Sequence, residues 1–333
     1  MSARVDFTGR RVAVTGGAGL IGSYLVEHLA AAGARVTVVD DFSKGRRENL
    51  AAVSDRIEVR EGDLEDARFA FEAVEGAEVV FHLASRAFGV GYGNGRHVEI
   101  LNHNERITTN LIDALARLRP AHVLMTSSSC VYDDDGPETM PELPLFDREP
   151  EKVNWGYGWA KRFLEQKSVI LSRETGIPVT IVRPFNIYGE RYLWVGEYSQ
   201  AIPMLIKRVM DGEDPVVMWG SGRQRRNYMH ASDCARLMMR LVAAGHSSAP
   251  VNLGTEETIT VHELVELICR RGGKTPILKT DTTKPEGRFC KSASSERLRA
   301  ILGDLDLKVT LDDGIGRMID WYRATFPSPE NHH

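Results

Sequence analysis

The residues best suited to chemistry are a tyrosine and a lysine four positions apart, Tyr157 and Lys161, in the segment YGWAK. On an α-helix, side chains at this spacing share one face. A phenol has a reference pKa of about 10 and is a poor base at neutral pH, but a neighbouring ammonium favours the phenolate. That phenolate could take a proton from a hydroxyl group while a hydride leaves the carbon. An isolated YxxxK spacing is common on helix surfaces, so the pair needs support from its context.

A second group of reactive side chains, in MTSSSCVYDD, precedes that pair and contains Ser128 and Cys130. The group ends an apolar run that predicts a strand, and ligands of open α/β sheets bind at the carboxyl ends of strands. Its hydroxyl groups could therefore orient a substrate. Cys130 could be a small buried side chain that fills space.

A glycine-rich turn near the start of the chain predicts a dinucleotide site. In VAVTGGAGLIGSYLVEHL, Gly16, Gly19 and Gly22 fall between a predicted strand and a predicted helix, together with Leu20 and Ile21. Small residues let the backbone approach a pyrophosphate, which would lie at the positive N-terminus of the helix. The spacing alone is weak evidence, and the strand before it and the helix after it strengthen the prediction.

Acidic residues at the ends of the next two predicted strands indicate which dinucleotide binds. Asp40 and Asp41 close the run VTVVDD, and Asp40 follows the last glycine by about eighteen residues. A carboxylate there can accept hydrogen bonds from ribose hydroxyls and would repel a 2′-phosphate, so NAD is favoured over NADP. The nearby Arg46 and Arg47 leave that preference open. Asp63 could bind the adenine amine.

The elements that must position these residues alternate along the chain. Apolar, β-branched runs predict strands at 11–15, 36–40, 57–61, 79–83, 122–127 and 179–183, and helical spacing predicts helices at 22–32, 105–118 and 158–174. This alternation predicts an α/β fold with a Rossmann-type, doubly wound parallel sheet. Residues 1–185 are expected to form the NAD-binding domain, its sheet continued by parts of 225–255. Residues 186–330 are expected to form mainly a smaller, partly interleaved substrate domain.

Composition excludes several other classes of function. The 333 residues carry a net charge of −4 without a long basic run, which argues against nucleic acid as a partner. The four cysteines lie far apart without a CxxC pair, so neither a metal site nor a disulfide framework is expected. No apolar run approaches the roughly 18 residues that span a bilayer. We therefore expect a cytoplasmic protein without a membrane partner.

Taken together, these motifs resemble the extended short-chain dehydrogenase/reductase family, which includes nucleotide-sugar epimerases and dehydratases. The resemblance covers nearly the whole chain and rests on TGGAGLIG, Asp40, Asp63, HLAS, SSSCVY, YGWAK, RPFNIYG and GSGRQRRNYMHASDCAR. It implies that NAD stays tightly bound and is recycled. Such an enzyme oxidises a nucleotide sugar at C4 to a ketone, acts on that intermediate and returns the hydride.

The resemblance also implies roles for individual residues. Ser128 matches the hydroxyl of the catalytic triad, beside Tyr157 and Lys161. The matching cofactor-wall positions are Leu64, Ala84 and Asn104. The matching substrate positions are Gly89, Asn186, Gln200, Arg226 and Arg288, of which Asn186 and the two arginines would hold the nucleotide diphosphate.

The residues after the triad hydroxyl distinguish members of the family. Dehydratases carry an Asp-Glu pair there, and this chain has Ser129 and Cys130, which argues against water elimination. A cysteine at this position resembles GDP-mannose 3,5-epimerases and GDP-fucose synthases, in which the thiol and a lysine or histidine exchange protons at C3 and C5. Here the second position matches Gln200, and an amide has no useful ionisation.

Two epimerase readings therefore stay open. In the favoured one, the protein inverts C4 alone, on a GDP-sugar or another nucleotide sugar. In the other, Cys130 with a water or a nearby ionisable group inverts an additional centre, as in GDP-mannose 3,5-epimerases. A reductase would need exchangeable NADPH, against which Asp40 argues. A non-catalytic dinucleotide sensor is the remaining alternative, although Tyr157 and Lys161 are both present.

Two of the predicted helices also bear on assembly. Helices 105–118 and 158–174 carry apolar residues at helical spacing, which could simply cover the sheet. Members of the family commonly pair these helices across a two-fold axis. The resemblance thus implies a homodimer through a four-helix bundle.

Overall fold

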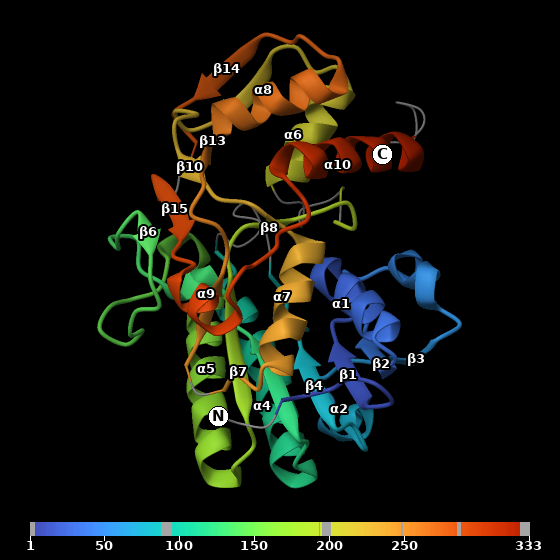
Figure 1. The fold of residues 1–333 in the computed structure, drawn as a ribbon. Coiled ribbons are helices and arrows are strands. Elements are labelled where there is room, and N and C mark those ends of the chain that lie inside the picture. Colours follow the sequence, from blue (N-terminus) through green and yellow to red (C-terminus); the bar gives the residue numbers. More distant parts are fainter. Residues whose placement is uncertain are drawn as a thin grey trace.

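A parallel sheet forms the centre of the computed structural model, which describes residues 4–87, 95–192, 194, 201–247, 249–284 and 288–326. Its seven strands lie in the order β12-β7-β5-β4-β1-β2-β3 (Figure 1). They are β1 (Arg11–Thr15), β2 (Arg35–Asp40), β3 (Ile57–Glu61), β4 (Val79–His82), β5 (His122–Thr126), β7 (Val179–Pro184) and β12 (Val251–Leu253). All neighbouring pairs in this sheet are parallel.

Helices cover both faces of this sheet. On one face, α1 (Leu20–Ala31) packs against α7 (Ala231–Ala243). The other face is covered by α2 (Ala67–Val74), α4 (His97–Leu118) and α5 (Trp155–Thr175), and α4 and α5 lie side by side (Figure 1). Strand β1 shows the alternation that this requires. Val12 and Val14 pack with α1 and α7, whereas Ala13 packs with α4 and α5. Burial on both faces explains why the central strands are continuous apolar runs.

The order in which strands are added to the sheet reverses between β1 and β4. From β1 the chain moves outward through β2 and β3, and it then returns to add β4, β5, β7 and β12 on the other side. The loops after β1 and β4 therefore turn away from each other, which opens a crevice at the carboxyl ends of these strands. The glycine-rich turn follows β1, and the segment HLAS includes the end of β4.

A second lobe lies over this crevice. It contains α6 (Ala201–Met210), α8 (Val261–Gly272) and α10 (Leu311–Thr325), which share an apolar core with the strand pair β9 (Val216–Trp219) and β14 (Leu278–Asp281). Strands β6 (Thr139–Met140), β10 (Arg225–Arg226), β13 (Ile259–Thr260) and β15 (Cys290–Ala293) form a small sheet between the two lobes, and β8 (Ile187–Tyr188) pairs with β11 (Met229–His230). The other short helices are η1 (Arg47–Val53), η2 (Ser129–Val131), η3 (Lys152–Asn154) and α9 (Glu296–Leu302).

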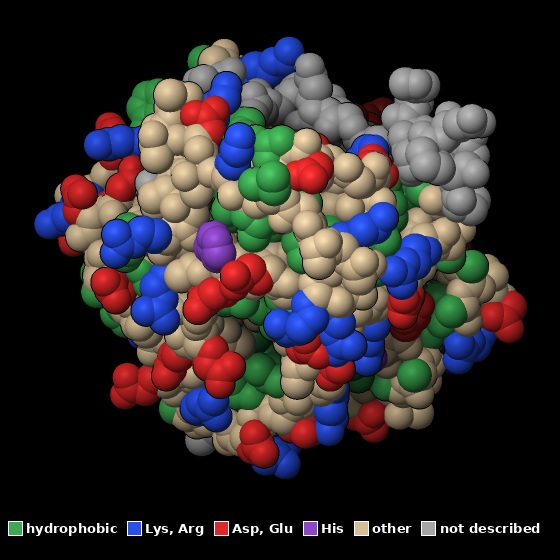
Figure 2. Space-filling model, turned by 90° about the horizontal axis from the view of Figure 1, so that it is seen from above, with side chains coloured by type: hydrophobic (Ala, Val, Ile, Leu, Met, Phe, Trp, Pro, Cys, Tyr) green, Lys and Arg blue, Asp and Glu red, His purple; other side chains and the backbone are tan. Residues whose placement is uncertain are grey.

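The surface over this second lobe carries charges of both signs. Figure 2 shows basic and acidic side chains intermingled across that face of the described residues. None of the helices in the described ranges is long and apolar enough to cross a membrane. Within the same ranges, no group of three or more His, Cys, Asp or Glu side chains is placed to hold a metal ion.

The predicted fold class is confirmed, and α7 and β12 show the interleaving directly, because the chain returns from the second lobe to the sheet. Strands β1 and β3 have the predicted bounds. Helix α4 begins at His97, well before the predicted residue 105. Its first turns contain Asn102, His103 and Asn104, which have low helix propensity, although His103 and Asn104 are buried there. The division of the chain into domains at residue 185 stays a prediction.

Candidate active site

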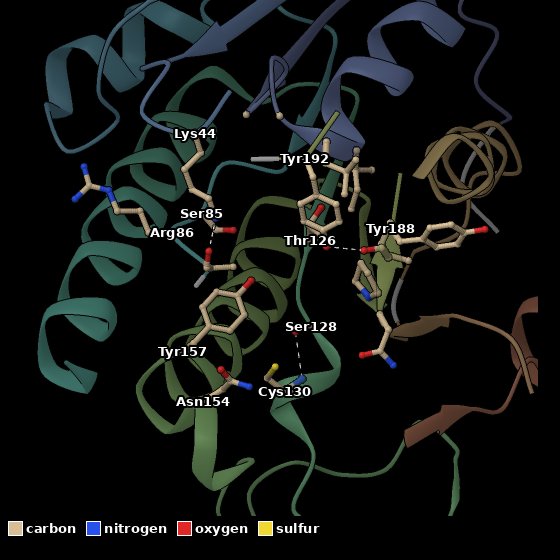
Figure 3. Close-up of a pocket in the computed structure, with 18 of the residues that line it drawn as sticks. Lys44, Ser85, Arg86, Thr126, Ser128, Cys130, Asn154, Tyr157, Tyr188 and Tyr192 are labelled. Carbon is tan, nitrogen blue, oxygen red and sulfur yellow. Dashed lines mark hydrogen bonds between the residues drawn. The ribbon is translucent and has the colours of Figure 1, made fainter. Parts of the chain in front are cut away.

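A cavity of about 1000 Å³ occupies the crevice between the sheet and the second lobe (Figure 3). We call it the central cavity. Most of the predicted site residues line it: Gly16, Gly19, Leu20, Ile21, Gly22, Asp40, Asp41, Asp63, Leu64, Ala84, Ser128, Cys130, Tyr157, Asn186 and Arg226. Residues from both lobes thus face one space, which is large enough for a dinucleotide and a second ligand. Gly89 and Gln200 lie outside the described residues.

The glycine-rich turn forms a cradle at one end of the central cavity. Gly16 has a φ of +69°, and a Cβ atom there would lie 2.7 Å from the backbone nitrogen of Ala84. A Cβ atom on Gly22 would lie 2.1 Å from the carbonyl oxygen of Gly16. Larger residues would therefore separate α1 from the sheet. Helix α1 begins after Gly19, which has no side chain to cap it, so its first N–H groups can receive an anion.

The Asp40 carboxylate stabilises the glycine-rich turn through hydrogen bonds. It accepts hydrogen bonds from the backbone N–H groups of Ala18, at 2.9 Å, and Phe42, at 3.0 Å. Asn49 donates to the Ala18 carbonyl at 2.8 Å, which fixes the same residue from its other side. Burial raises the pKa of Asp40, and the two backbone hydrogen bonds oppose that shift. The turn, the uncapped helix and this carboxylate fit an adenine dinucleotide without a 2′-phosphate.

Tyr157 and Lys161 share one face of α5, as predicted from their spacing. The Lys161 Nζ lies 5.5 Å from the centre of the Tyr157 ring and donates to the Thr126 carbonyl at 2.8 Å. Tyr157 and Ser85 both face the central cavity (Figure 3). Burial raises the pKa of Tyr157 and lowers that of Lys161 to about 7. The chain alone therefore holds Tyr157 as a protonated phenol above a buried amine.

Cys130 lies on the short helix η2, and Ser128 is the N-cap residue of that helix. The Ser128 Oγ accepts a hydrogen bond from the Cys130 backbone N–H at 3.2 Å, drawn in Figure 3. Both side chains face the central cavity. The backbone N–H of Glu151 donates to the Cys130 carbonyl at 3.3 Å. Because the Cys130 side chain faces the central cavity and is only partly buried, Cys130 is not a filler of the apolar core.

Three predicted residues are not among the described residues that line the central cavity. They are Lys161, Asn104 and Arg288. The Asn104 side chain bonds both the N–H and the carbonyl of Arg86, at 3.0 and 3.2 Å, which fixes the wall after β4. The Arg288 guanidinium donates to the carbonyls of Gly136, at 2.7 Å, and Pro137. The contacts of Asn104 with the cofactor and of Arg288 with a diphosphate therefore stay predictions.

Sequence reasoning missed three residues of the cavity wall. Ser85, Glu151 and Lys291 all line it. Ser85 stands in the recognised segment HLAS, but nothing in the sequence pairs it with Tyr157. Glu151 and Lys291 are 140 residues apart and belong to none of the recognised motifs. A covariation signal between the last two positions is the kind of information that could have found them.

Comparisons with known proteins agree with this geometry. A family model described as the NAD dependent epimerase/dehydratase family matches residues 12–254. The chain is 29% identical over 340 residues to a putative GDP-L-fucose synthase 2 of Oryza sativa subsp. japonica, covering 100% of this chain and 93% of that protein.

Two solved structures of similar chains contain a ligand. A UDP-glucose 4-epimerase of Thermotoga maritima, solved with UDP-glucose, has a TM-score of 0.82 and 27% identity, covering 95% of this chain and 99% of that one. A UDP-glucose 4-epimerase of Thermus thermophilus, complexed with NAD, has a TM-score of 0.80 and 25% identity, covering 94% of this chain and 99% of that one.

Proposed function

The chain belongs to the NAD-dependent epimerase/dehydratase family, and on that premise we propose that it inverts C4 of a nucleotide sugar through a transient 4-keto intermediate. The observation that carries the proposal is the placement of Tyr157, above Lys161, on the wall of a cavity that also contains the glycine cradle. This arrangement needs only one proton-transfer group and one hydride acceptor. The sugar can turn over after oxidation, so that the hydride returns to its other face.

NAD is the cofactor of this family, and the cavity suits it. Gly16, Gly19 and Gly22 would receive the pyrophosphate at the start of α1, and Asp40 would receive the adenosine ribose. When bound, NAD supplies a positively charged ring that accepts the C4 hydride and returns it. Tight binding and recycling of NAD follow from the proposed reaction, because the cycle leaves NAD unchanged.

Tyr157 holds and moves the proton of the C4 hydroxyl. Burial keeps the pKa of its phenol high, and a positive charge brought near the ring lowers it. The Lys161 Nζ is fixed by the Thr126 carbonyl and can supply such a charge from below the ring. Ser85 and Ser128 present hydroxyl groups to the same part of the cavity and orient the sugar. Asp40 thus serves cofactor binding, whereas Tyr157 and Lys161 serve proton transfer.

The nucleotide would occupy the half of the cavity formed by the second lobe. Arg226 and Asn186 line this half, and a guanidinium suits a diphosphate. Met204, Trp219 and Tyr228 provide an apolar and aromatic surface for a base. The rice relative, named a GDP-L-fucose synthase, supports a guanine nucleotide, whereas the two 4-epimerases are named for UDP-glucose. GDP-sugars are therefore the first substrates to test.

A second candidate function is inversion at C3 or C5 through Cys130. The thiol faces the central cavity, which favours this candidate over a purely structural cysteine. A reductase of the GDP-fucose synthase kind would draw on free NADPH, and the Asp40 carboxylate opposes its 2′-phosphate. A dinucleotide sensor would have no need of the intact Tyr157 and Lys161 pair.

A homodimer is the proposed assembly. Ile107, Leu111 and Leu115 of α4 and Leu164 of α5 are buried against the sheet, so they do not supply an interface. Phe163 and Ile170 remain exposed on the outer side of α5, at 38% and 45%, and Ile112 and Val169 are partly exposed beside them. Pairing of α4 and α5 with the same helices of a second copy would cover this face.

The proposed function is tested by incubating the purified protein, without added NAD, with GDP-mannose, UDP-glucose, dTDP-glucose and CDP-glucose. Proton NMR identifies the products. A C4 epimer from one of these sugars supports the proposal. A reductase would instead convert none of these sugars and would reduce a 4-keto nucleotide sugar, supplied in their place, only when NADPH is added.

A further inference from the structure

A buried ion pair lies one helical turn after Lys161 on α5. The Arg183 guanidinium, on β7, donates to the two carboxylate oxygens of Glu165 at 2.8 and 2.7 Å. The side chains of Arg183 and Glu165 are only 3% and 8% exposed. Burying two charges is costly, and well-packed apolar residues of similar size often hold a core at least as well. Packing alone therefore does not account for the pair.

The Glu165 carboxylate also holds the end of β5. It accepts a hydrogen bond from the Ser127 hydroxyl at 2.5 Å. The carbonyl of the preceding residue, Thr126, accepts from the Lys161 Nζ at 2.8 Å. Two consecutive residues at the end of β5 are thus bonded by two side chains that stand four positions apart on α5. Side chains at that spacing share one helix face, with Cβ atoms about 5–6 Å apart, so the carboxylate lies close to the amine.

Glu165 therefore places a negative charge beside the Lys161 amine. Burial lowers the pKa of Lys161 to about 7, and the Glu165 charge opposes that shift. Without the carboxylate, a smaller fraction of Lys161 would be charged at neutral pH. The charged form matters because a positive charge beneath the Tyr157 ring favours its phenolate.

Other titratable side chains near Lys161 are neutral at pH 7. On β4, the His82 ring is fully buried, its Nδ1 atom lies 2.8 Å from the Thr15 Oγ1, and burial lowers its pKa to about 3. On η2, burial raises the pKa of the Cys130 thiol to about 12. Burial also raises the pKa of Tyr157 on α5 itself. None of these three side chains brings a charge to Lys161 at neutral pH.

Charged side chains on the neighbouring α4 and β7 are paired with other residues. On α4, the Glu105 carboxylate accepts from the Nζ of Lys167, further along α5, at 2.6 Å. On β7, the Arg183 guanidinium is occupied by Glu165 itself. Among the residues that the structure describes, Glu165 is therefore the charge that most directly opposes the effect of burial on Lys161.

We propose that Glu165 is a positioning residue, which keeps Lys161 in its ammonium form beneath Tyr157. It also fixes the end of β5 through Ser127. The inference rests on the proposed function, because Lys161 serves that function through the proton held by Tyr157. Glu165 contacts neither the sugar nor the phenol in this scheme and acts through Lys161. Arg183 holds the carboxylate ionised and in place.

The direct test follows the charge of Lys161 without any substrate. The purified protein, prepared with isotope-labelled lysine and with NAD present, is titrated by NMR, and Lys161→Met identifies the Lys161 signal. Glu165→Gln keeps the size of the side chain and removes its charge. We expect it to lower the midpoint of the Lys161 titration by about one pH unit, the smaller effect of a nearby opposite charge. Glu174→Gln, at an exposed residue of the same helix, should leave the midpoint unchanged.

A second variant covers the case in which Glu165→Gln fails to fold, because that change leaves Arg183 buried without a charged partner. The double variant Glu165→Gln with Arg183→Met removes both charges. It is expected to lower the midpoint as well, because Glu165 is the member of the pair on the helix face of Lys161. A folded variant of either kind in which Lys161 titrates as in the wild type overturns the inference.

The same variants test the consequence for C4 oxidation, with GDP-mannose and UDP-glucose as probes and the absorbance of the NADH formed as the readout. Glu165→Gln is expected to move the pH dependence of the rate to lower pH by the same amount. In a Lys161→Met background it should cause no such movement. A pH dependence that stays in place while the Lys161 titration moves contradicts the positioning role and leaves the proposed function intact. Absence of C4 oxidation with every nucleotide sugar contradicts the proposed function instead, and the titration alone then decides whether Glu165 sets the charge of Lys161.

Discussion

The Nζ atom of Lys161 lies 5.5 Å from the centre of the Tyr157 ring and is anchored to the Thr126 carbonyl at 2.8 Å. Thr126 is the last residue of β5, so the sheet fixes the amine and the amine in turn lies beneath the phenol. Burial lowers the pKa of Lys161 to about 7, and the Glu165 carboxylate opposes that shift. The charge beneath Tyr157 is therefore sensitive to what binds in the cavity.

The first prediction concerns the Tyr157 hydroxyl. Tyr157→Phe removes the group that takes the C4 proton and keeps the ring. We expect the rate of C4 oxidation to fall about 10²–10⁴-fold, the usual contribution of a positioned acid or base. NADH formation from NAD already bound, followed by absorbance, measures that step. NAD content after purification serves as the control and should not change. A variant that still oxidises the sugar at the wild-type rate would contradict the assignment.

The second prediction concerns the glycine cradle. Gly16→Ala adds left-handed strain and a Cβ atom 2.7 Å from the Ala84 nitrogen. We expect a loss of about 2–5 kcal/mol in the free energy of unfolding, combining strain with overpacking, and weaker NAD binding. Gly76→Ala is the matched control, because Gly76 has a φ of +77° but open space around it. That variant should lose only about 1–2 kcal/mol and bind NAD normally. Equal effects at both positions would mean that the close approach to Ala84 is unimportant.

The third prediction concerns pH. Burial lowers the pKa of Lys161 to about 7, so the amine beneath Tyr157 is charged at acidic pH and becomes neutral as the pH rises through about 7. A positive charge near the ring favours the phenolate of Tyr157. The rate of C4 oxidation is therefore expected to change with pH near 7 in the wild type, and Lys161→Met is expected to lose that dependence. Absorbance of the NADH formed between pH 6 and 9 measures it, and the same pH profile in both proteins would contradict the role of Lys161.

The fourth prediction concerns assembly. Ile170→Asp places a charge on the exposed apolar face of α5 and is expected to convert the proposed dimer to a monomer. Sedimentation velocity distinguishes the two. Ile277→Asp, at a residue that is 60% exposed in the other lobe, is the matched control and should leave the dimer intact. A wild type that sediments as a monomer would contradict the four-helix interface.

The sequence predicted those parts of the site that depend on local spacing. A turn between a strand and a helix demands small residues, which predicts Gly16 and Gly22. The end of the next strand points to the same edge of the sheet, which predicts Asp40. Tyr157 and Lys161 were placed on one helix face by their separation. The doubly wound sheet followed from the alternation of strands and helices. Each of these inferences needs only neighbouring residues and a general rule of α/β folds.

Long-range contacts could not be predicted in this way. Glu151 and Lys291 meet only because β15 packs beside the loop that precedes α5, and their separation carries no periodic signal. The resemblance predicts a diphosphate contact for Arg288 from its motif position alone, and the loop carbonyls of Gly136 and Pro137 that its guanidinium bonds could not be foreseen from that position. The early start of α4 depended on burial of His103 and Asn104, which outweighs their weak helix propensity.

The most direct test of the proposed C4 chemistry follows the hydrogen at C4 itself. The purified protein, without added NAD, is incubated with nucleotide sugars deuterated at C4 in ordinary water, and the products are read by NMR. The proposed cycle predicts a C4 epimer that keeps its deuterium, because the hydride is removed and returned within the cavity. An epimer that has replaced the C4 deuterium by hydrogen from water would contradict transient oxidation at C4.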